Sequence, residues 1–112
     1  MNKIQIRAEI LTLITKLQTT TAVSDDMFKA LDDEPDKQAI MDVLLKELQR
    51  AKEQKAFVIC YILTRLFEKD FLITNLREFI RDRKISDYAK MIAFNLLKDL
   101  GNEVQYDEVS GY

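Results

Sequence analysis

The sequence predicts an all-α protein of about six helices, packed as stacked antiparallel hairpins. One observation is the scarcity of turn residues: the 112 residues include one proline and two glycines, at positions 101 and 111. A β-rich chain of this length needs several tight turns with positive φ, which glycine normally supplies. The other observation is periodicity, because apolar residues recur every three or four positions, which is the spacing of an amphipathic helix.

The N-terminal part of the chain predicts one long helix and one short helix. Residues 3–17 carry an apolar stripe that includes Ile10 and Ile14. Ser24 is a plausible N-cap for the short helix, because its hydroxyl can accept from a free backbone N–H and two aspartates follow it at the positive end of the dipole. Residues 3–31 are therefore expected to form an N-terminal hairpin or cap.

The middle of the chain predicts a third and a fourth helix. The acidic segment 32–36 interrupts the periodic pattern, and Pro35 fits the first position of the third helix, where its missing N–H would be unpaired anyway. This helix is expected to end near residue 52. The fourth helix, over about residues 55–69, is apolar on nearly all sides and is expected to be buried between its neighbours.

The last two helices are expected over residues 72–83 and from Ser86, as an N-cap, to Gly101, as a C-cap. Truncation of Phe94 to alanine, or the same change at Leu63 in the fourth helix, is expected to cost about 2–5 kcal/mol of stability.

An internal repeat joins the last four helices. Shifting the sequence by 31 positions places Leu-Lys-Glu-Leu of residues 45–48 on Leu-Arg-Glu-Phe of residues 76–79. The unit is two helices joined by a short polar turn, which gives two repeat-like hairpins over residues 37–70 and 71–101. These units resemble HEAT and armadillo-type repeats. The resemblance implies an α-solenoid that binds other macromolecules along one face, and it transfers no catalytic residue. A compact helical bundle is the alternative architecture.

The repeat offset also aligns cations. Lys46 and Arg50 lie four residues apart, as do Arg77 and Arg81, so each pair shares one helix face. If the two units stack, the four cations form a basic ladder that can hold carboxylates or phosphates, and Arg83 and Lys84 extend it at the turn. Glutamates and aspartates are interleaved with these cations, so an ordinary mixed, solvated surface is the alternative interpretation.

Composition argues against several classes of function. The chain has one cysteine and no histidine, so no zinc site, disulfide framework or histidine-dependent catalytic site is expected. Cys60 lies in the most apolar segment and is expected to be a buried, inert thiol. The acidic stretch around 25–36 lacks the glycine and glutamate of an EF-hand loop. We therefore expect no cofactor, no metal and no enzymatic activity.

The domain is expected to span residues 1–102, followed by an acidic flexible tail over residues 103–112. The longest apolar run, residues 56–63, is far too short to span a membrane, and a single cysteine suggests a reducing compartment, so a cytoplasmic location is expected.

The sequence leaves three functions open. The first is a non-catalytic protein–protein interaction module, or small scaffold or adaptor, that holds an acidic partner segment on the basic ladder. The second is binding of the nucleic-acid backbone by the same ladder, and the third is a homodimerising structural protein. The net charge of -2 favours the first.

Overall fold

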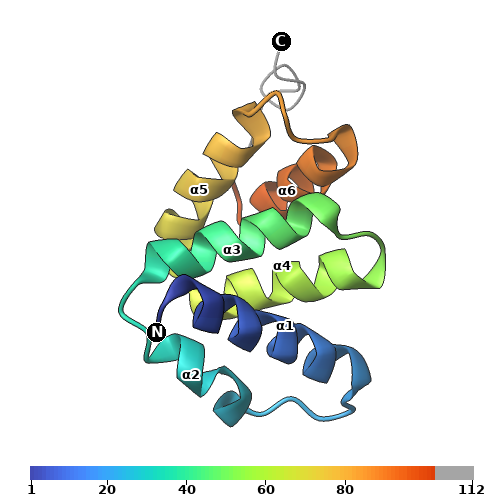
Figure 1. Ribbon diagram of the computed structural model, residues 1–112. Helices are drawn as coiled ribbons and strands as arrows, with labels where there is room; N and C mark the ends of the chain where they lie inside the picture. The colour runs from blue at the N-terminus through green and yellow to red at the C-terminus, as the bar shows by residue number, and fades with distance from the viewer. Residues whose placement is uncertain (103–112) are drawn as a thin grey trace.

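The computed structural model describes residues 1–102, which form six α-helices and no β-strand (Figure 1). A single 3-10 turn, η1, precedes the short helix α2. The elements in chain order are α1 (Lys3–Thr19), η1 (Asp25–Phe28), α2 (Lys29–Asp32), α3 (Lys37–Arg50), α4 (Gln54–Leu66), α5 (Lys69–Arg81) and α6 (Asp87–Asp99). The all-α prediction is confirmed, and the expected tail over residues 103–112 lies outside the described residues.

Side-chain caps fix several of the helix ends. The Ser86 hydroxyl accepts from the Ala89 N–H at the start of α6, as predicted. Gly101 adopts a positive φ of 79° after α6, and the N–H groups of Gly101 and Asn102 donate to carbonyls of the last turn, which is a Schellman motif. The sequence interpretation missed the capping box of Asn2 and Gln5 that starts α1.

Other boundaries differ from the prediction by a few residues. Pro35 precedes the N-cap instead of starting α3, because the Asp36 carboxylate accepts from the Ala39 N–H at 3.0 Å and takes the capping position. The third helix ends at Arg50. A positive φ of 54° at Glu53 then reverses the chain into α4.

The junction between α4 and α5 lies three residues earlier in the chain than expected. Phe67 has extended backbone dihedrals, which end α4 at Leu66, and its ring packs on the Phe71 ring with centroids 5.5 Å apart. The carbonyl of Glu68 already accepts from the Leu72 N–H at 3.0 Å, so α5 begins at Lys69. Only two residues separate the two helices.

The helices pack in a repeating pattern. Helix α4 packs against α3, its own hairpin partner, and against α1, the first helix of the preceding hairpin. Helix α6 likewise packs against α5 and against α3 (Figure 1). Each second helix therefore covers the seam between two successive first helices, which is a repeat-like arrangement.

The buried positions show how many residues separate equivalent positions of the two hairpins. Three buried positions of α3, which are Ile40, Leu44 and Leu48, recur 32 residues later in α5 as Leu72, Leu76 and Ile80. The buried positions of α4 recur 34 residues later in α6, where Ala56, Ile59, Ile62 and Leu63 correspond to Lys90, Ala93, Leu96 and Leu97. The 31-residue offset is therefore wrong by one residue in the first helices. One residue is a rotation of 100° about a helix axis.

The N-terminal helix follows the same rule. Ile6, Ile10 and Ile14 of α1 are buried, and they correspond to the buried Ile40, Leu44 and Leu48 of α3 at an offset of 34. Helix α1 is thus a third copy of the first helix, with the short η1–α2 segment in the place of its partner.

The core contains Leu63, with no exposed surface, as expected. Two other expectations are corrected. Phe94 is only half-buried, with the Lys98 ammonium 5.8 Å from its ring centroid. Helix α4 is not buried on all sides, because Phe57 and Tyr61 are 67% and 45% exposed. Within residues 1–102, no helix combines the length and the apolar character needed to cross a bilayer.

Candidate functional site

A basic hollow lies between α1 and α3. It has a volume of about 360 Å³, and we call it the α1–α3 hollow. Seven residues line it, and most of the lined surface belongs to apolar atoms: Lys3, Ile4, Arg7, Val43, Lys46, Glu47 and Arg50. Four of the seven are cations, two from each helix. The structure thus brings together two of the predicted residues, Lys46 and Arg50, with two that were not predicted.

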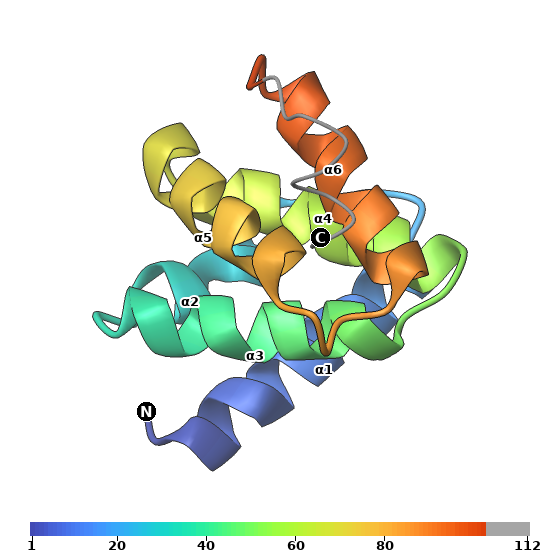
Figure 2. The same ribbon diagram turned by 90° about the horizontal axis from the view of Figure 1, so that it is seen from above.

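Helix geometry explains the convergence. Lys3 and Arg7 lie four residues apart on α1, and Lys46 and Arg50 lie four residues apart on α3, so each pair shares a face. Helix α1 passes across α3 at an angle instead of running alongside it (Figure 2). Residues of both helices line the hollow. Only the tertiary crossing joins the pairs, which is why the sequence pattern alone did not reveal Lys3 and Arg7.

The α1–α3 hollow is also lined by apolar side chains. Ile4 is 81% exposed, which is unusual for an isoleucine in a helix, and Val43 beside it is half-buried. Glu47 also lines the hollow and is a buried residue. The hollow therefore combines four cations with apolar side chains and one acid.

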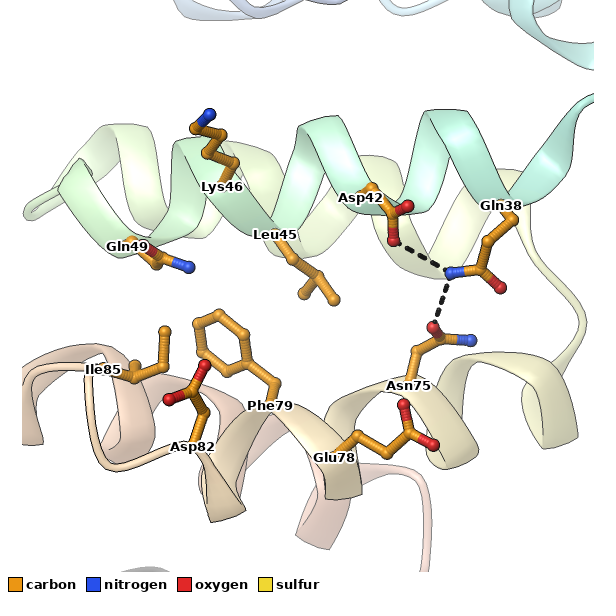
Figure 3. Close-up of a pocket in the computed structure, with 10 residues that line it drawn as sticks. All are labelled: Gln38, Asp42, Leu45, Lys46, Gln49, Asn75, Glu78, Phe79, Asp82 and Ile85. Atoms are coloured by element: carbon orange, nitrogen blue, oxygen red, sulfur yellow. Dashed lines mark hydrogen bonds between the residues drawn. The ribbon is translucent and has the colours of Figure 1, made fainter.

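A second hollow lies between α3 and α5, and we call it the α3–α5 hollow (Figure 3). Its volume is about 490 Å³, and its surface is divided evenly between polar and apolar atoms. The Gln38 amide nitrogen donates to the Asp42 carboxylate and to the Asn75 amide oxygen, both at 2.9 Å, and so bridges the two helices. Glu78 and Asp82 add two further carboxylates on the α5 side.

The two hollows are equivalent in structure and opposite in charge. Helix α3 contributes four residues to the first hollow, Val43, Lys46, Glu47 and Arg50. Helix α5 and its C-cap residue contribute the residues 32 positions later to the second, Asn75, Glu78, Phe79 and Asp82. The positions of Lys46 and Arg50 are thus taken by acids in the second hairpin. Lys46 also borders the second hollow, but its side chain points away from α5 (Figure 3).

The remaining predicted cations lie elsewhere. Arg77 is half-buried, and its guanidinium donates to the Asn102 amide oxygen at 2.9 Å. Arg81 is exposed in the last turn of α5, and neither arginine lines the α1–α3 or the α3–α5 hollow. Arg83 and Lys84 are exposed in the connection to α6. The one-residue error in the repeat offset explains the separation, because a 100° rotation moves a side chain to another face.

The other chemically interesting side chains have structural partners. Burial, and secondarily the charge of Asp99, raises the pKa of the Cys60 thiol to about 11, which keeps it protonated at neutral pH. Asp25 accepts from the Arg65 guanidinium, which also lies 5.1 Å from the Phe28 ring centroid, so these residues hold η1 against α4. Among residues 1–102 no group of three or more cysteine or acidic side chains is placed to hold a metal ion.

Comparisons with protein-family models, with curated proteins and with solved structures gave no match for this chain.

Proposed function

We propose that this protein is a non-catalytic interaction module of the helical-repeat type, similar to HEAT and armadillo repeats, that holds an acidic segment of a partner protein in the α1–α3 hollow. The carrying observation is the convergence of Lys3, Arg7, Lys46 and Arg50 from two helices around one hollow. Such a module would act as a small scaffold or adaptor. A cytoplasmic location belongs to the same proposal, and the lone, protonated Cys60 thiol is consistent with it.

Charge complementarity supports an acidic partner. Four cations around a concave surface raise the local potential, which attracts carboxylates and speeds association. Arginine adds bidentate hydrogen bonds to carboxylates. Among residues 1–102, the one acid that lines the hollow is Glu47, so cations outnumber acids there by four to one. The cations are therefore placed to meet an external anion.

Binding to a nucleic-acid backbone is the second candidate, because phosphates would be attracted by the same four cations. The net charge of -2 is unfavourable for it. The α3–α5 hollow is also unfavourable, since its carboxylates would repel a phosphate chain that continued along the stack. The experiment below separates the two candidates directly.

The test is fluorescence anisotropy with two labelled probes, a peptide of nine glutamates and a single-stranded RNA of 20 nucleotides. We expect the peptide to bind the natural chain, and Lys46→Glu with Arg50→Glu to remove that binding. The control carries Lys16→Glu and Lys29→Glu, which change net charge equally at exposed positions away from the hollow. A third variant, Arg83→Glu with Lys84→Glu, tests the extension of the originally predicted ladder.

The outcomes are distinct. Loss of peptide binding in the hollow variant alone supports the proposal. Preferential binding of the RNA, with a log–log salt slope of about -0.7 per phosphate contact, would establish the second candidate instead. Equal loss of peptide binding in the control would mean that net charge, and not the hollow, is responsible. If the Arg83 and Lys84 variant alone lost binding, the site would lie at the α5–α6 connection.

A homodimer is the third candidate, and the exposed face of α4 favours it. Phe57 and Tyr61 lie one turn apart and are both exposed, and exposed aromatics of this kind are common in interfaces. Sedimentation equilibrium tests this candidate. A dimer that becomes monomeric on Phe57→Ser would support it, and a natural chain that is monomeric at 100 μM would contradict it.

A further inference from the structure

We infer that the partner segment carries an apolar side chain flanked by carboxylates, and that this apolar side chain packs on Ile4 and Val43 in the α1–α3 hollow. This inference rests on the function proposed above and specifies its ligand. It comes from the mixed lining of the hollow, in which four cations accompany the exposed Ile4 and the half-buried Val43.

The lining of the hollow can accept an apolar group. Ile4 has 81% of its surface exposed within a concave site, so covering it removes apolar area from water, at about 25 cal/mol per Å². The aliphatic stems of Lys3 and Lys46 extend the apolar wall, because lysine keeps only its ammonium in water. A volume of about 360 Å³ is at the lower end for ligand pockets, which suits a few side chains of a peptide better than a cofactor.

Glu47 disfavours an anion placed beside it. It lines the hollow, and its carboxylate would repel a phosphate or a carboxylate brought close to it. An anion is therefore favoured beside the ammonium and guanidinium groups. A peptide can place an apolar side chain against Ile4 and carboxylates beside the cations, whereas a phosphate backbone has no apolar group to offer.

The positions of the cations determine where the partner peptide should carry its carboxylates. One cation pair comes from α1 and the other from α3, so they lie on opposite walls. Carboxylates on both sides of the anchor can reach both walls, and carboxylates on one side reach only one. The ligand class is thus an acidic peptide with a single internal aliphatic residue.

The test compares two nine-residue peptides that carry four glutamates on each side of a central residue, which is leucine in one and serine in the other. Calorimetry should show that the natural chain binds the leucine peptide roughly tenfold more tightly, since partial burial of one leucine is worth about 1.4 kcal/mol. Ile4→Ser should remove this preference. Isoleucine and serine have similar helix propensities, so the fold should persist. The matched control is Val23→Ser, at an exposed position of the loop after α1.

The failures of this inference and of the proposed function are distinguishable. Equal binding of both peptides, lost in the Lys46→Glu and Arg50→Glu variant, would overturn the apolar anchor and keep the acidic partner. A leucine preference that survives Ile4→Ser would overturn the assigned contact with Ile4. If neither peptide binds the natural chain, both the proposed function and the inference fail.

Discussion

The first and second complete hairpins, α3–α4 and α5–α6, share a buried pattern and differ in the charge of their surfaces. Leu44 and Leu76 are equivalent and have no exposed surface, whereas Lys46 and Glu78, two residues further on, carry opposite charges. The comparison teaches that the buried residues determine how the two hairpins align with each other. Exposed residues at equivalent positions can differ in charge and so form different sites.

The largest effect should come from the shared buried positions. Leu44→Ala and Leu76→Ala should each reduce the free energy of unfolding by about 2–5 kcal/mol, because each leaves a cavity at a fully buried site. Leu63→Ala should cost a similar amount of stability, because Leu63 is also fully buried. Phe94→Ala should cost less, because Phe94 is only half-buried. Urea denaturation measures all four variants. A loss below about 1 kcal/mol at either Leu44 or Leu76 would break the equivalence of the two hairpins.

The next effect tests the surface difference by transplanting one site onto the other. Glu78→Lys with Asp82→Arg places the cations of the first hollow at the equivalent positions of the second. Calorimetry with the nine-glutamate peptide should then give a stoichiometry near two instead of one, and the free energy of unfolding should change by less than about 1 kcal/mol, because exposed charges contribute little. A stoichiometry that stays at one would show that equivalent positions do not make equivalent sites.

A smaller effect distinguishes the turns within the hairpins. Glu53 in the α3–α4 turn has a φ of 54°, which glycine adopts without strain, and its N–H donates to the Tyr88 hydroxyl oxygen at 2.9 Å. The α5–α6 connection has no positive φ at residues 82–86. Glu53→Gly should therefore stabilise the chain by about 1 kcal/mol, which corresponds to a rise in Tm of about 4–8 °C. Asp82→Gly is the control, and it should not raise the Tm.

The smallest effect concerns the loops that precede the two hairpins. Glu34 is buried before α3, where the Met1 amino group and the Asp36 N–H donate to its carboxylate and hold its pKa below the ordinary value of 4.5. A lowered pKa in the folded state means that this stabilisation is fully present above about pH 4.5 and is lost as the pH falls through the folded-state pKa. Thermal unfolding between pH 3 and pH 7 should show a weaker pH dependence for Glu34→Gln. An unchanged dependence would exclude Glu34 as a contributor.

Much of the fold could be predicted from the sequence, because it depends on local signals. The apolar period placed each helix, and Ser86 and Gly101 marked the ends of α6 correctly. The helix ends that were misplaced depend on tertiary contacts or on competition between neighbouring residues for the capping position. Asp36 displaced Pro35 from the expected helix start, and the extended backbone of Phe67 ends α4 three residues before the expected position.

Only two of the four cations of the α1–α3 hollow, Lys46 and Arg50, were predicted from the sequence. Aligning the sequence with itself by residue type gave an offset of 31, because similar residues happen to align there. The buried positions of the first helices, α3 and α5, align at an offset of 32. The error moved the equivalents of Lys46 and Arg50 onto Arg77 and Arg81. Comparing buried apolar positions, instead of all residue types, would have favoured 32. The crossing of α1 over α3, which adds Lys3 and Arg7, has no signal in either helix alone.

The most direct test of the central claim is a ¹⁵N–¹H NMR titration of the natural chain with the leucine-centred acidic peptide. If the α1–α3 hollow is the binding site, the largest amide shifts should cluster at residues 3–7 and 43–50. Residues that border only the α3–α5 hollow, such as Asn75 and Asp82, should shift little. Shifts that cluster on α5, that spread evenly over the surface, or that stay absent at saturating peptide would contradict the assignment of the α1–α3 hollow as the partner site.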